Sequence, residues 1–120
     1  MESNLIQKIF PPVTENEQNL KYDAEGLWSI TYPKEADIIS MIIKNELGSN
    51  IKIMDATAGI GGNTISFGKN FNQVVSVEIS PERFAMLITN AQVYNLTNIN
   101  FINGIEASAV MPKRIKSFKD

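Results

Sequence analysis

The chain has 120 residues, a formal net charge of −2, and 43% hydrophobic and 20% charged residues, which are ordinary proportions for one small globular domain. It contains no cysteine and no histidine, which excludes disulfides, thiolate metal sites, and the commonest metal ligand and general base. The slight acidity argues against long nucleic acid held by bulk electrostatics. No apolar run reaches the ~20 residues that span a bilayer, and the N-terminus lacks a signal-peptide pattern. We therefore expect an intracellular, soluble protein without a bound metal.

The chain begins with a polar stretch, residues 1–22, which is interrupted by Pro11 and Pro12. We predict that this stretch is a tail outside the core and that residues 23–120 form a cofactor-binding domain. Apolar residues then recur at helical spacing and Gly48 provides a stop, which predicts a helix over residues 33–47. The residues on this apolar face are Ala36, Ile39, Ile42, Ile43 and Leu47.

Three short patterns rich in β-branched residues, at 51–55, 73–78 and 99–102, predict strands. A helix is predicted from Gly62 to about residue 69, and a second one from a Ser80 cap to about residue 95. This alternation predicts parallel βαβ units with right-handed crossovers. We therefore expect an α/β, Rossmann-like sheet with strand order 3-2-1, partial because later strands are missing. Residues 106–120 are predicted to form a short helix and a basic connection.

The first predicted strand ends in an acidic, glycine-rich loop. Asp55 ends the strand, and Gly59, Gly61 and Gly62 precede the next helix. Glycines allow positive φ angles and let a ligand approach without meeting a Cβ atom. Thr64 replaces the third glycine of the dinucleotide fingerprint, and no Gly-Lys-Ser/Thr loop is present. Because an acid repels a pyrophosphate and complements an amine, S-adenosyl-L-methionine fits this loop better than NAD or ATP does.

Glu78 ends the second predicted strand. Ligands of open α/β sheets lie at the carboxyl ends of the strands. A carboxylate at this place is suited to accept hydrogen bonds from both hydroxyl groups of an adenosine ribose, and such bonds are charge-assisted. The alternative is a solvated strand-end acid that favours the N-terminus of the following helix.

Two further places have both a structural and a functional interpretation, and a third departs from the expected adenine contact. Ser29 and Thr31 either cap the following helix or bind the methionine carboxylate above the glycine loop. Trp28 is either a core residue or a stacking platform or lid. After the third strand, Ile105 follows Gly104, so only an apolar side chain is available to pack against an adenine ring.

Three segments, in chain order, resemble the RNA cap guanine-N2 methyltransferases, of which trimethylguanosine synthase is the type. Residues 25–31 are similar to that family's glutamate-glycine-aromatic-aromatic-serine-valine-threonine segment. Residues 55–65 are similar to its motif I, including the glycine-glycine-asparagine-threonine ending, and residues 90–94 to its asparagine-alanine-glutamate-valine-tyrosine helix end. The resemblance covers about residues 22–105.

The resemblance implies a class I methyltransferase that uses S-adenosyl-L-methionine to methylate the exocyclic N2 of a guanine at an RNA 5′ cap. Asp55, Gly59 and Glu78 would bind the methyl donor. The full set of candidate cofactor-binding residues is Thr31, Asp55, Ala56, Ala58, Gly59, Gly61, Gly62, Asn63, Glu78, Ile79, Gly104 and Ile105.

The sequence departs from the family's pattern in two places. Ile105 stands in place of an acid, and the family's catalytic loop, an asparagine or aspartate followed by Pro-Pro-Trp, is absent before Asp120. Catalytic residues are therefore unassigned. Two alternatives stay open: a truncated or non-catalytic protein that binds S-adenosyl-L-methionine and needs a missing segment or a partner chain, and an NAD-binding module.

Overall fold

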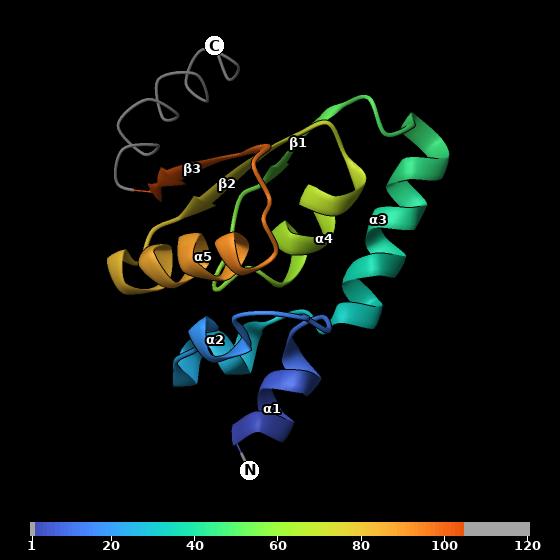
Figure 1. Ribbon diagram of the computed structural model, residues 1–120. Coiled ribbons are helices and arrows are strands. Elements are labelled where there is room, and N and C mark those ends of the chain that lie inside the picture. The colour runs from blue at the N-terminus through green and yellow to red at the C-terminus, as the bar shows by residue number, and fades with distance from the viewer. Residues whose placement is uncertain (1, 105–120) are drawn as a thin grey trace.

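The computed structural model describes residues 2–104, which build a three-stranded parallel sheet flanked by helices (Figure 1). The strands are β1 (Lys52–Asp55), β2 (Gln73–Glu78) and β3 (Ile99–Asn103), in the order β1-β2-β3. All three predicted strands and their parallel order are therefore confirmed. The prediction for residues 106–120 lies outside the described residues.

The helices that connect the strands begin and end close to the predicted positions. α4 (Gly62–Asn70) joins β1 to β2, and α5 (Pro81–Val93) joins β2 to β3. The Ser80 side chain caps α5 by accepting a hydrogen bond from the backbone N–H of Arg83, as the Ser-Pro pair predicted. In the sheet register Asp55 pairs with Ser76 and Glu78 with Asn103, so the carboxyl ends of β1 and β2 lie at the same edge.

Helix α3 (Pro33–Leu47) has the predicted bounds, but its buried face differs from the predicted apolar face. Ala36 and Ser40 are its buried residues, whereas Ile42 and Leu47 are exposed. The Ser40 and Ser66 hydroxyl groups are 2.7 Å apart, which places this face of α3 against α4. Most of the apolar face therefore stays open to solvent in the described part of the chain.

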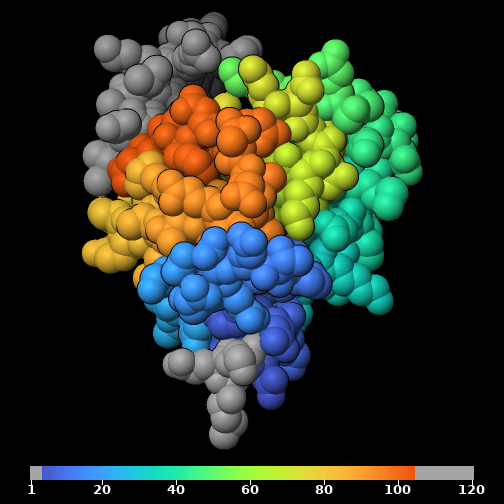
Figure 2. All heavy atoms as spheres, viewed as in Figure 1, coloured from blue at the N-terminus to red at the C-terminus, as the bar shows by residue number. Residues whose placement is uncertain are grey.

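The prediction that residues 1–22 lie outside the core is wrong. This segment contains α1 (Glu2–Ile9) and a short 3-10 helix (Glu17–Asn19), and it packs against α5 at the bottom of Figure 2. Ile9, Phe10 and Leu20 are buried in one cluster with Ile60 of the glycine loop. The apolar residues of α1 recur at helical spacing, and the polar composition around them concealed this pattern.

Asn90 of α5 fastens this N-terminal segment to the glycine loop. Its side chain is fully buried, exchanges two hydrogen bonds with the backbone of Lys21, and donates a third to the carbonyl of Ile60 at 2.7 Å. Both amide hydrogens are thus used.

Among residues 2–104, no helix is long and apolar enough to span a bilayer.

Candidate functional site

A cavity of about 350 Å³ opens between the glycine loop and the segment around α2 (Ala24–Ser29). Part of its wall comes from α2 and the turn after it, and the rest from the loop, α4, β2 and α5. Six of the predicted cofactor-binding residues line this cavity: Thr31, Ala58, Gly59, Gly62, Asn63 and Glu78. Five others do not: Asp55, Ala56, Gly61, Ile79 and Gly104. Ile105 lies outside the described residues.

The glycine loop adopts the backbone that the sequence predicted. Gly59 and Gly61 have φ angles of 59° and 114°, which side chains rarely allow. Gly62 has no positive φ, but a Cβ atom there would lie 2.6 Å from the carbonyl oxygen of Thr31. The loop therefore needs glycine at positions 59 and 61 for its turn. It needs glycine at position 62 because the turn after α2, which we call with α2 the α2 side of the cavity, approaches closely there.

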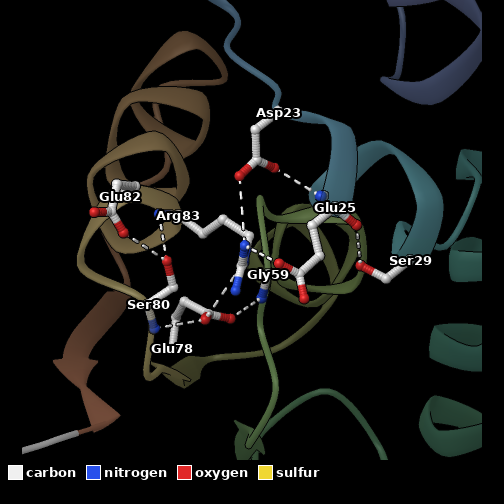
Figure 3. A network of polar contacts seen from close by, with 9 residues as sticks. Asp23, Glu25, Ser29, Gly59, Glu78, Ser80, Glu82 and Arg83 are labelled. Carbon is white, nitrogen blue, oxygen red and sulfur yellow. Dashed lines mark hydrogen bonds and ion pairs between the residues drawn. The ribbon is translucent and has the colours of Figure 1, made fainter.

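Glu78 lines the cavity and is held from two sides. Its Oε1 accepts a hydrogen bond from the Gly59 N–H at 2.8 Å, and its Oε2 accepts one from the Ser80 N–H at 2.9 Å (Figure 3). The residue is 7% exposed, so it is not a solvated strand-end acid. The two backbone hydrogen bonds fix the orientation of the carboxylate. Because each carboxylate oxygen has two lone pairs, both oxygens can still accept a further hydrogen bond.

Asp55 is also buried, at 8% exposed, but its carboxylate does not line the cavity. Its Oδ2 accepts a 2.7 Å hydrogen bond from the Thr64 hydroxyl, which is itself 2.7 Å from the Ser76 hydroxyl. Burial raises the pKa of Asp55, the Thr64 and Thr57 hydrogen bonds oppose this shift, and the charge of Glu78 adds to it. Of the two strand-end acids expected to bind the methyl donor, only Glu78 lines the cavity, and Asp55 instead accepts a hydrogen bond from Thr64 at the start of α4.

The contacts of α2 and of the turn after it exclude two structural interpretations, a capping role for Ser29 and Thr31 and a core position for Trp28. The cap residue of α3 is Tyr32, which makes no side-chain cap bond, and Ser29 donates to the Glu25 carbonyl at 2.9 Å. Neither Ser29 nor Thr31 therefore caps α3. Trp28 is 91% exposed at the cavity wall, so it is not a core residue.

Asn63 presents a buried acceptor beside this wall. Its Nδ2 donates to the Thr31 hydroxyl at 3.1 Å. Its Oδ1 is buried and has no hydrogen-bond partner among the residues that the structure describes. An unpaired buried carbonyl is costly, so this atom is suited to accept a hydrogen bond from a ligand.

Sequence reasoning missed Arg83, which also lines the cavity. Its Nη1 lies 2.8 Å from Glu25 Oε2 and 3.4 Å from Asp23 Oδ2, and its Nε lies 3.8 Å from Glu78 Oε2. A sequence clue was available, because a basic residue in the first turn of a helix opposes the helix dipole and needs acidic partners.

Comparison with known families and curated proteins found matches to this chain. Residues 50–119 match the model of the RNA cap guanine-N2 methyltransferase family. The chain is 34% identical over 123 residues to trimethylguanosine synthase of Schizosaccharomyces pombe, covering 86% of this chain and 50% of that protein. It is 30% identical over 128 residues to the uncharacterized protein L320 of Acanthamoeba polyphaga mimivirus, covering 88% and 50%. The chain thus spans about half the length of these relatives.

Solved structures show the same fold. The tRNA (m1A58) methyltransferase TrmI of Aquifex aeolicus has a TM-score of 0.54 and 23% identity, over 62% of this chain and 30% of that chain. An rRNA methylase of Streptococcus thermophilus has a TM-score of 0.51 and 16% identity, over 61% and 43%. At these identities the likeness concerns fold alone, and it confirms a partial Rossmann-like methyltransferase fold.

Proposed function

The chain belongs to the RNA cap guanine-N2 methyltransferase family, and from this membership and the cavity we propose that it binds S-adenosyl-L-methionine for methylation of a guanine N2 at an RNA 5′ cap. The cofactor supplies a methyl group on a sulfonium. A capped RNA substrate would place the protein in the cytoplasm or nucleus. The observation that carries the proposal is the buried, doubly fixed carboxylate of Glu78 in the cavity beside the glycine loop.

The residues present fit the proposed cofactor. The two oxygens of Glu78 would accept the ribose hydroxyl groups, with the Gly59 and Ser80 N–H groups keeping the carboxylate in place. The unpaired Oδ1 of Asn63 would accept from the cofactor's ammonium, and Thr31 lies beside it. The described residues that line the cavity include two acids, Glu25 and Glu78, and one cation, Arg83, so the wall is net negative, which suits a ligand whose ammonium and sulfonium outnumber its one carboxylate.

The chain's own contribution to the reaction is binding and orientation. Holding donor and acceptor in line is worth up to roughly 7–11 kcal/mol of the barrier in favourable cases. Such a role needs neither histidine nor metal, and the sequence has no histidine. Among residues 2–104, no cluster of His, Cys, Asp and Glu side chains is suited to hold a metal ion.

Calorimetric titration with S-adenosylhomocysteine tests the cofactor proposal. The wild-type chain is expected to bind it, and Glu78→Gln is expected to bind it about 10- to 100-fold more weakly, because charge-assisted hydrogen bonds are worth roughly 1.5–3 kcal/mol. Glu82→Gln is the matched control, since Glu82 is exposed on α5 and does not line the cavity. Binding of NADH in place of S-adenosylhomocysteine would support the NAD-binding alternative and overturn the proposal.

A methylation assay with a cap analogue distinguishes a chain that catalyses the reaction alone from one that binds the cofactor but needs a further segment or a partner chain. Steady turnover by the 120-residue chain would assign the whole reaction to it. Cofactor binding without turnover would favour a protein that needs a further segment or a partner chain to hold the guanine.

A further inference from the structure

Arg83 connects the two walls of the cavity. It lies in the first turn of α5, and its guanidinium reaches Glu25 on the α2 side while its Nε faces Glu78 on the β2 side, as Figure 3 shows. Asp23, the third acid it contacts, caps α2 by accepting the Gly26 N–H at 2.7 Å. One side chain therefore joins the cap and the first turn of α2 to the carboxylate proposed to bind ribose.

The charges around Arg83 explain why it stays at this place. Desolvation lowers the pKa of the guanidinium, but the charges of Glu25, Asp23 and Glu78 outweigh this effect and raise it above its ordinary value. The side chain is therefore cationic at any physiological pH. Without it, the carboxylates of Glu25 and Glu78 at the cavity, and that of Asp23 beside them, would have no cation between them, and α2 and β2 would repel each other.

The position of α2 bears directly on the cavity. Gly26 packs so tightly on the glycine loop that a Cβ atom there would lie 2.7 Å from the Ile60 side chain. Trp28 and Ser29 of the same helix line the cavity. A small shift of α2 would therefore move the wall against which a ligand rests.

From these contacts we infer that Arg83 is a positioning residue for the cofactor. By holding Asp23 and Glu25 next to Glu78, it fixes the distance between the α2 wall and the ribose-binding side, and so makes cofactor affinity depend on ionic strength. The inference rests on the proposed function of the cavity and assigns no contact between Arg83 and the reacting atoms.

The test is the affinity for S-adenosylhomocysteine at about 0.01 M and 1 M salt, where the Debye length falls from about 30 Å to 3 Å. Arg83→Gln is expected to weaken binding about fivefold to tenfold at low salt, the combined effect of several partly exposed ion pairs. The loss should shrink at high salt, and Arg83→Lys should recover much of the affinity. Lys44→Gln, a charge removal on α3 away from the cavity, should leave it unchanged.

A charge exchange adds a readout that a purely structural role would not move. Arg83→Glu and Glu25→Arg should each weaken binding, and the double variant should bind more tightly than the product of the two single effects allows. Glu25→Gln removes one pair at a mostly exposed residue, so it serves if an Arg83 variant does not fold. We expect Glu25→Gln to weaken low-salt binding about threefold.

Unfolding curves without ligand accompany each titration. If Arg83→Gln lowers the melting temperature but binds like the wild type at low salt, or if the exchanged pair shows no recovery, the inference is overturned while the proposed function stands. If the wild-type chain does not bind S-adenosylhomocysteine, the proposed function fails first, and the inference fails with it.

Discussion

Asp55 and Glu78 are buried carboxylates at the ends of neighbouring strands, but only Glu78 lines the cavity. Within residues 2–104, Glu78 accepts hydrogen bonds from the backbone N–H groups of Gly59 and Ser80, and it lines the cavity. Asp55 accepts from the Thr64 hydroxyl at the start of α4, so it ties β1 to the helix behind the loop. The two acids therefore divide the work: one is available to a ligand, and the other holds the loop in shape.

Asp55→Asn is expected to raise stability at neutral pH. Because burial raises the pKa of Asp55 in the folded chain, its ionised form costs stability above that raised pKa, and the cost disappears below the ordinary value of 3.8. An asparagine has no charge to desolvate and keeps a partner for Thr64. Thermal unfolding from pH 7 to pH 4 should show the variant's advantage shrinking as the pH falls. A variant that is less stable than the wild type at pH 7 would contradict this account of Asp55.

At the scale of elements, the contact between α4 and the segment after α2 depends on Gly62. A methyl group at this position would meet the Thr31 carbonyl oxygen and the Ile30 side chain at 2.6 and 2.8 Å. Backbone atoms cannot move aside as a flexible side chain does, so the two elements would have to separate. The width of the cavity is thus set by a missing side chain.

Gly62→Ala is expected to cost about 1–3 kcal/mol of stability, as overpacking does, and to weaken S-adenosylhomocysteine binding about tenfold or more. Gly48→Ala is the matched control. Its φ of 78° with ψ of 178° makes alanine strained by roughly 1–3 kcal/mol, but nothing lies within 4 Å of the added atom. Denaturant unfolding and calorimetry should therefore show similar stability losses and an affinity loss for Gly62→Ala only. Equal affinities would show that the contact does not shape the cavity.

The elements from α3 to β3 could be predicted because their signals are local. The Ser80-Pro81 cap, the Gly48 stop and the alternation of strands and helices depend on residues near one another in sequence. The contacts that join Arg83 to the α2 side of the cavity could not be predicted in this way. Arg83 and Glu25 are 58 residues apart, and no local pattern pairs them. That the Asp55 carboxylate bonds to Thr64 and does not line the cavity could not be predicted either, because it depends on the place of Thr64 in the folded chain.

At the scale of the whole molecule, the N-terminal segment is part of the core. Phe10 is 1% exposed and belongs to the same buried cluster as Ile60 of the glycine loop. The Tyr94 hydroxyl group donates a hydrogen bond to the Pro11 carbonyl at 2.6 Å, and the Asn90 side chain bonds to the backbone of Lys21. The folded N-terminal segment therefore packs against Ile60 and supports the glycine loop on the side away from solvent.

Phe10→Ala is expected to destabilise the chain by about 3–5 kcal/mol, the usual cost of truncating a buried aromatic residue. Leu47→Ala is the control, because Leu47 is 65% exposed and its truncation should cost less than about 1 kcal/mol. Chemical unfolding followed by circular dichroism measures both. Similar small losses for the two variants would mean that the N-terminal segment is a tail after all.

A crystal structure of the chain with S-adenosylhomocysteine would show where the nucleoside lies. We expect both ribose hydroxyl groups within about 2.6–3.2 Å of the Glu78 carboxylate oxygens, with the ligand's ammonium beside Asn63 Oδ1 and the Gly59 N–H bond to Glu78 retained. A ligand bound outside this cavity, or a Glu78 side chain turned away from the ribose, would contradict the assignment of the site.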